Sequence, residues 1–121
     1  MIRATRRAAL AGALALPAAA AMAEARPKPS GTVLVHDPSL EAGRRFAAAA
    51  EARGEKVLAI EGDRIRFARR LFERAPALVL GVSRSADAVL IEDVGREAGY
   101  MPAAVPTPLA DEFTWAVAPR A

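Results

Sequence analysis

The side chains best suited to chemistry gather where apolar, β-branched runs of this sequence end. They supply imidazole, carboxylate, hydroxyl and guanidinium groups and belong to His36, Asp37, Arg64, Ser83, Arg84 and Ser85. Guanidinium groups and the free N–H groups of helix N-termini both bind small anions such as carboxylates and phosphates. If the apolar runs are neighbouring parallel strands, these residues meet at the strands' carboxyl ends, where such sheets bind ligands. We therefore expect a small-anion site there.

A serine and a histidine among these residues allow a second interpretation, a minimal hydrolase or transferase that uses Ser83 and His36. His36 would have to lie within hydrogen-bond reach of Ser83, with a carboxylate such as Asp63 to orient it. Residues 81–85 are similar to the G-x-S-x-G nucleophile elbow, which also lies between a strand and a helix. However, Ser85 replaces the final glycine and no histidine follows downstream. These departures favour a local structural role, and we assign no catalytic residue.

The composition excludes several kinds of site. The chain of 121 residues has no cysteine and one histidine, which excludes a disulfide framework, a thiolate metal site and a multi-histidine cluster. Glycine-rich phosphate loops and the acidic spacing of a calcium loop are also missing. We therefore expect neither a metal nor a cofactor.

The positive charge of the chain comes from its N-terminus. Lys and Arg total 17 against 14 Asp and Glu, and Arg3, Arg6 and Arg7 lie in a stretch, residues 1–23, without an acid. The remaining residues carry 14 basic and 14 acidic side chains. A domain without net charge lacks the basic footprint of a nucleic-acid-binding protein, so we expect no nucleic acid partner.

Residues 1–23 have the three regions of a secretory signal peptide. A short basic start is followed by an uncharged, alanine-rich stretch over residues 8–23, which ends in the small-x-small pattern of residues 21–23. Gly12 and Pro17 interrupt this stretch, which is also shorter than the roughly 20 strongly apolar residues that a bilayer requires. We expect export to the periplasm with cleavage after Ala23, and no permanent membrane span.

Within this leader, the segment Thr-Arg-Arg-Ala-Ala-Leu of residues 5–10 resembles the signal of the twin-arginine translocation (Tat) pathway. The weakly hydrophobic core, rich in Ala and Gly, is also similar to Tat signals, although Ala9 stands where that pattern prefers a bulky residue. The resemblance covers only the leader. It implies a domain that folds before it crosses the membrane.

The mature chain alternates predicted strands and helices. After a flexible leader over residues 24–31, we expect strands over 32–36, 56–60 and 77–82 and helices over 38–53, 64–75 and 85–98. Asp37 and Asp63 are expected to cap the first two helices, and Ser85 to start the third. The predicted inner face of the third helix consists of Ala86, Val89, Leu90 and Val94.

This alternation predicts a single α/β domain over residues 32–121. Continuously apolar strands are typical of a mostly parallel sheet that helices cover on both faces, which makes a three-layer domain. Right-handed crossovers favour about four strands in the order 2-1-3-4, half of a doubly wound fold. Residues 101–109 contain three prolines and predict an extended loop, and residues 113–117 alternate as a final strand with Phe113, Trp115 and Val117 inward.

The second predicted helix allows a further interpretation, a protein-interaction module. Arg66, Arg70 and Arg74 fall on one stripe of this helix, with Arg69 beside them, and could dock on an acidic partner or on anionic lipid. A solvated helix face is the structural alternative. An edge strand near Trp115 is another candidate interaction surface.

No constellation in the sequence meets the needs of catalysis, so we expect an exported, non-enzymatic binding or accessory module. Its partner would be a small anion at the strand ends or a protein. If the strand-end loop functions, Arg84 rather than Ser83 is expected to carry that function, because Arg84 has no acid within two residues.

The leader generates the first prediction. Periplasmic protein should have the intact mass of a chain that begins at Glu24. Changing both Arg6 and Arg7 to Lys should block export if the Tat pathway is used, because that pathway recognises the arginine pair, whereas the general secretory pathway requires only positive charge. Recovery of full-length protein from the cytosol alone would contradict export.

Overall fold

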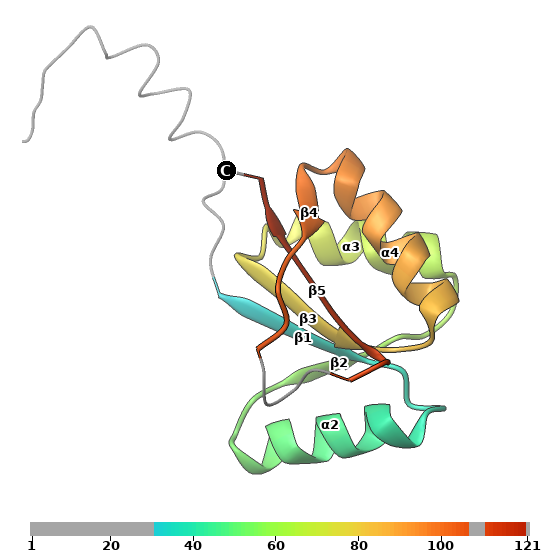
Figure 1. Ribbon diagram of the computed structural model, residues 1–121, viewed down its shortest axis with the longest axis vertical. Helices are drawn as coiled ribbons and strands as arrows, with labels where there is room; N and C mark the ends of the chain where they lie inside the picture. Colours follow the sequence, from blue (N-terminus) through green and yellow to red (C-terminus); the bar gives the residue numbers. More distant parts are fainter. Residues whose placement is uncertain (1–30, 107–110, 121) are drawn as a thin grey trace, which may run out of the picture.

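Three helices and a five-stranded sheet make up the part of the chain that the computed structural model describes, residues 31–106 and 111–120 (Figure 1). In chain order these elements are β1 (Thr32–His36), α2 (Glu41–Ala52), β2 (Val57–Ala59), α3 (Arg64–Glu73), β3 (Leu78–Val82), α4 (Ser85–Glu97), β4 (Tyr100–Pro102) and β5 (Thr114–Pro119). The α/β class predicted from the sequence is confirmed.

The parallel half of the sheet agrees with the prediction. β1 lies between β2 and β3 and is parallel to both, with Val35 opposite Leu58 on one side and Gly81 on the other. The chain passes from β1 to β2 in one direction and from β2 across to β3 in the other. The carboxyl ends of β1 and β3 are therefore the switch point at which a ligand site was expected.

The other half of the sheet corrects the prediction of a mostly parallel, four-stranded sheet. The final strand, β5, does lie beside β3, but it is antiparallel to it, and β4 is a fifth, unpredicted strand at the edge. The crossover through α4 places β4 two positions away from β3, and β5 returns antiparallel to fill the gap. The fold is thus a mixed sheet rather than half of a doubly wound one.

Tertiary contacts explain why β4 forms where a loop was expected. The buried Tyr100 donates a hydrogen bond from its hydroxyl to the carbonyl of Pro76, at 2.6 Å. Its ring lies 4.7 Å from that of Phe72. Met101 and Pro102 extend the strand along β5, and proline is tolerated there because β4 is an edge strand. Residues 107–109 of the predicted loop lie outside the described residues.

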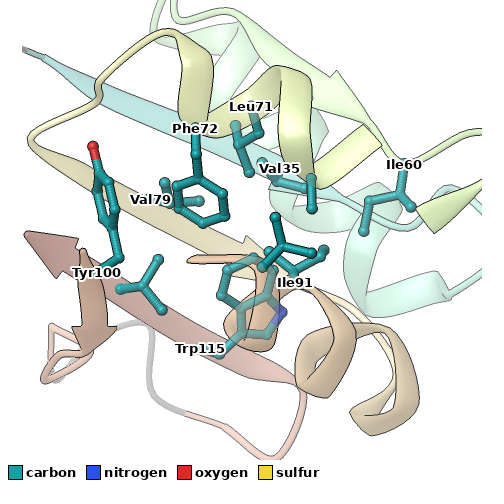
Figure 2. Packing of buried hydrophobic residues seen from close by; sticks show 11 residues of the cluster. Val35, Ile60, Leu71, Phe72, Val79, Ile91, Tyr100 and Trp115 are labelled. Atoms are coloured by element: carbon teal, nitrogen blue, oxygen red, sulfur yellow. The ribbon is translucent and has the colours of Figure 1, made fainter. Parts of the chain in front are cut away.

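Helices cover both faces of the sheet, as Figure 1 shows. α2 packs on one face through Phe46 and Ala50, against Leu34 and Leu80. α3 and α4 cover the other face, where the larger apolar cluster lies (Figure 2). That cluster contains Val35, Ile60, Ala68, Leu71, Phe72, Val79, Ile91, Val94, Tyr100, Trp115 and Val117.

The apolar pattern of the first three strands predicts nine buried residues, and the structure buries these nine to different degrees. Five are buried, namely Leu34, Val35, Ile60, Val79 and Leu80. Four are only half-buried, namely Val33, Val57, Leu58 and Leu78. The half-buried residues lie on the edge strand β2 or near the starts of β1 and β3, where fewer neighbours cover them.

The helix starts agree with the sequence at two of three positions, Asp63 and Ser85. Asp63 caps α3 by accepting a hydrogen bond from the N–H of Arg66, as predicted. Asp37 does not cap α2, because its carboxylate binds Ser39 in a turn and the helix begins only at Glu41. Ser85 is the first residue of α4, after Arg84 at the cap position.

The predicted inner face of α4 was largely wrong. Of its four residues only Val94 is buried, while Val89 and Leu90 are exposed. Ile91 and Gly95 face the core instead, and Gly95 lets the ring of Phe72 approach the helix backbone. The helix is apolar on two sides, so its periodicity alone did not indicate which side faces the sheet.

Trp115 fixes β5 against β3. It lies opposite Gly81 in the strand register, and its indole covers that glycine so closely that a Cβ there would overlap the ring. The indole Nε1 donates to the buried Ser83 hydroxyl at 2.9 Å, and this hydroxyl donates to the Arg84 carbonyl at 3.0 Å. The Gly-Val-Ser segment of residues 81–83 is therefore the part of β3 and its following loop against which the indole ring of Trp115 packs.

This contact generates the second prediction. Ser83→Ala leaves the buried indole N–H without its acceptor and should lower the free energy of unfolding by about 1–3 kcal/mol. Ser85→Ala is the matched control and should change stability by no more than about 0.5 kcal/mol, because Ser85 is exposed. Urea unfolding followed by the fluorescence of Trp115, the only tryptophan, measures both. Equal losses in the two variants would contradict the structural role of Ser83.

Candidate functional site

The carboxyl ends of β1 and β3 lie side by side, as the sequence analysis required. His36 is opposite Val82, and the N–H of Asp37 donates to the carbonyl of Val82 at 2.9 Å. This pairing places Asp37 next to the loop that contains Ser83 and Arg84. Part of the predicted set of site residues therefore lies together at the carboxyl ends of these two strands.

Asp37 is the buried acid of this cluster, with 2% of its surface exposed. Its Oδ1 accepts hydrogen bonds from the backbone N–H of Ser39 at 2.9 Å and from the Ser39 hydroxyl at 2.7 Å. Burial alone raises the pKa of Asp37, but the bonds from Ser39 and the positive charges of Arg84 and Arg64 outweigh burial and bring this pKa below its ordinary value. Asp37 is thus an ionised, satisfied carboxylate.

Arg84 lies across from Asp37 with its side chain 59% exposed. Its Nε is 3.7 Å from Asp37 Oδ2, and its Nη2 is 3.5 Å from the Ser39 hydroxyl. The prediction that Arg84 has no neutralising acid is correct only for its neighbours in the sequence. In the folded domain, the parallel pairing of β1 with β3 brings Asp37 to it.

Arg64 also has an acidic partner. Its Nε is 3.2 Å from Asp87 Oδ1, and its Nη1 donates to the Gly62 carbonyl at 2.9 Å. This pair links the start of α3 to the first turn of α4. We call Asp37, Ser39, Arg64, Arg84 and Asp87 the strand-end cluster; its two arginines and two carboxylates give it no net charge.

Ser83 and His36 are not placed as a catalytic pair. The Ser83 hydroxyl is held under Trp115, whose indole belongs to the apolar cluster between the sheet and the helices α3 and α4. Val35 also belongs to that cluster, and since successive strand residues point to opposite faces, the side chain of His36 points toward the α2 face. Its Nδ1 is buried and has no hydrogen-bond partner among the described residues.

Ser39 is a member of the cluster that the sequence analysis missed. It bridges the carboxylate of Asp37 and the guanidinium of Arg84. The sequence does contain a signal for the position of Ser39. Asp-Pro-Ser is typical of a turn in which the aspartate accepts a hydrogen bond from the residue two positions later. The sequence analysis instead predicts that this segment forms the first turn of a helix.

A second charged surface lies on the outer side of α3. Arg66, Arg69, Arg70 and Arg74 are all exposed, and within the described residues none of them forms an ion pair or a side-chain hydrogen bond. Asp63 is near enough for Arg66 and Arg69 to contribute to lowering its pKa, after the larger effect of the Arg66 N–H. We call these four residues the arginine ridge.

Two hollows flank the arginine ridge. The first, of about 250 Å³, has an apolar floor that includes Leu58, Phe67 and Leu71 and a rim of Glu61, Arg70 and Arg74. The second, of about 280 Å³, lies between α3 and α4, and its charged lining residues are Arg69, Glu73 and Glu97. Positive charge and accessible apolar surface therefore occur together at the first hollow, whereas the second is lined by more acidic than basic side chains.

The strand-end cluster and the arginine ridge are the two candidate sites. Within residues 31–106 and 111–120, no group of three or more His, Asp or Glu side chains is arranged to hold a metal ion. No helix in the same ranges is long and apolar enough to cross a membrane. Comparison with protein-family models, with curated proteins and with solved structures finds no match.

The buried carboxylate generates the third prediction. Asp37→Asn should lower the free energy of unfolding by about 1–3 kcal/mol at pH 7. Because the pKa of Asp37 is lowered in the folded state, its stabilising effect is complete well above the ordinary value of 3.8 and is lost as the pH falls below it. The difference between variant and wild type in urea unfolding should therefore narrow as the pH falls below 3.8.

Asp93→Asn is the control for this measurement. Asp93 is an exposed carboxylate of α4 that pairs only with the exposed Arg96, so its loss should cost little at any of these pH values. A destabilisation of Asp37→Asn that does not change with pH would show that the carboxylate's charge is not what stabilises the turn.

Proposed function

We propose that the mature domain is an exported, non-enzymatic binding module that docks an acidic protein partner on α3. The observation that carries this proposal is the arginine ridge, whose four guanidinium groups have no carboxylate partner among the described residues. Guanidinium groups bind carboxylates in a two-pronged geometry and favour association with acidic surfaces.

The strand-end cluster supports a small-anion function less well. Asp37 and Asp87 already neutralise Arg84 and Arg64, so an incoming anion would compete with carboxylates held by the fold. The helix α4 also begins without a side-chain cap, but a helix N-terminus alone is a weak attraction for an anion beside a buried carboxylate.

The catalytic alternative is also less well supported. The Ser83 hydroxyl is occupied by two hydrogen bonds, and His36 lies on the other face of the sheet. The alternative interaction surface near Trp115 is not an edge, since β5 lies between β3 and β4. Among the candidate surfaces, the arginine ridge is the one whose charged side chains are both exposed and without an ion pair among the described residues.

The chemistry of the ridge favours a protein over a lipid surface. Membrane-binding helices insert an apolar face between lipids, whereas the apolar residues Ala68, Leu71 and Phe72 of α3 are buried in the core. The first hollow beside the ridge, with apolar residues and two arginines in its lining, suits the mixed polar and apolar side chains of a protein surface.

The fourth prediction concerns the position of the binding charge. The probe is a fluorescently labelled peptide that alternates Glu with small apolar residues, and its fluorescence anisotropy reports binding to the mature domain at physiological ionic strength. The triple variant Arg66→Ala, Arg70→Ala, Arg74→Ala should bind about tenfold more weakly, since each exposed ion pair contributes roughly 0.2–1 kcal/mol.

A second triple variant controls for net charge. Arg44→Ala, Arg45→Ala, Arg120→Ala removes the same number of charges from exposed positions outside α3 and should bind as the wild type does. Equal weakening in both triple variants would mean that only overall charge matters, and no binding by the wild type would overturn the proposed function.

A further inference from the structure

We propose that the free edge of β2 binds an extended acidic segment of the partner as an additional strand of the sheet. This inference rests on the proposed function and specifies how the arginine ridge would be used. Three observations carry it: the backbone of β2, the hollow beside that backbone, and the charge on the rim of the hollow.

The backbone of β2 is open on one side. Among the described strands, β2 pairs only with β1, and the N–H of Ile60 donates to the carbonyl of His36 at 2.9 Å. Because successive residues of a strand direct their backbone groups to opposite sides, Ala59 directs its N–H and C=O away from β1. No described residue pairs with that N–H, so it is available to an incoming strand.

The opposite edge of the sheet is less suitable. β4 ends in Pro102, which has no backbone N–H to donate. The two edges therefore differ, and the β2 edge has a hollow beside its open ladder. Strand addition at a sheet edge obtains affinity from backbone hydrogen bonds and specificity from pockets for alternate side chains.

The hollow lies where such side chains would enter. Ala59 is one of its lining residues, together with the apolar floor of Leu58, Phe67 and Leu71. A strand added beside β2 would direct every second side chain toward α3. One apolar side chain would occupy the floor, and its neighbours on the same face would reach the rim.

The charge on the rim selects the occupant. Arg70 and Arg74 outnumber Glu61 there, so acidic side chains two residues from the apolar one would be attracted. A second copy of this chain is the wrong occupant, because pairing β2 with β2 would bring two arginine ridges to the same edge and place like charges together. The occupant is therefore an extended segment with acidic residues at alternate positions around an apolar one.

The probe is the capped peptide Thr-Glu-Thr-Leu-Thr-Glu-Thr, which places both Glu residues and the Leu on one face of a strand. Two derivatives carry N-methyl groups on the backbone, one at the Thr positions and the other at the Glu and Leu positions. In an added strand, the backbone N–H groups of only one of these two sets of residues face β2. One derivative should therefore bind about tenfold more weakly or worse, the effect of losing backbone hydrogen bonds, while the other binds as the parent peptide does.

Amide hydrogen exchange of the protein gives an independent measurement. The N–H of Ala59 should exchange freely in the free domain and become protected when the peptide binds, whereas the N–H of Ile60 should be protected in both states. The triple variant of the arginine ridge should lose this peptide-induced protection of Ala59 at the same peptide concentration.

Each remaining outcome has a definite meaning. If both methylated peptides bind as well as the parent, an acidic partner binds the ridge without strand addition, which overturns this inference and leaves the proposed function standing. If the parent peptide does not bind but the peptide of the fourth prediction does, only this inference is overturned; if neither peptide binds, both proposals are overturned. If Ala59 is already protected without peptide and the domain sediments as a dimer, a second copy occupies the edge and this inference is wrong.

Discussion

The contact of Trp115 with Gly81 and Ser83 determines the arrangement of the C-terminal half of the domain. The indole covers a strand position that has no Cβ, and its N–H is satisfied by a buried hydroxyl at the end of the same strand. This contact holds β5 antiparallel beside β3 and makes β4 the outer strand. It also uses the serine that would otherwise be the best nucleophile in the sequence.

The distribution of ion pairs distinguishes the two candidate sites. At the strand ends, the parallel pairing of β1 with β3 and the packing of α3 against α4 bring a carboxylate to each arginine. On the outer face of α3 no packed element brings an acid within ion-pair distance, so the ridge remains unpaired among the described residues. The tertiary structure therefore neutralises the arginines of the strand-end cluster and leaves the arginine ridge without ion-pair partners among the described residues.

Local sequence signals predicted the elements well. β1 has the predicted bounds, and the three helices end within two residues of the predicted positions. Asp63 caps α3 because a capping aspartate needs only the N–H groups of the next turn, which the chain itself supplies. The order β2-β1-β3 also followed, since right-handed crossovers between parallel strands restrict the topology.

Contacts between distant residues account for what the sequence did not show. β4 depends on Tyr100 reaching the carbonyl of Pro76, and the inner face of α4 depends on Gly95 admitting the ring of Phe72. The pairing of Arg84 with Asp37 joins residues that only the sheet register brings together.

The sequence by itself therefore determined the helices, most of the strands and the polar residues at the switch point, because those depend on periodicity, caps and crossover handedness. Only the tertiary structure decided which arginines lack an ion pair among the described residues and which strands form the edges of the sheet, because both depend on what the folded chain packs beside them.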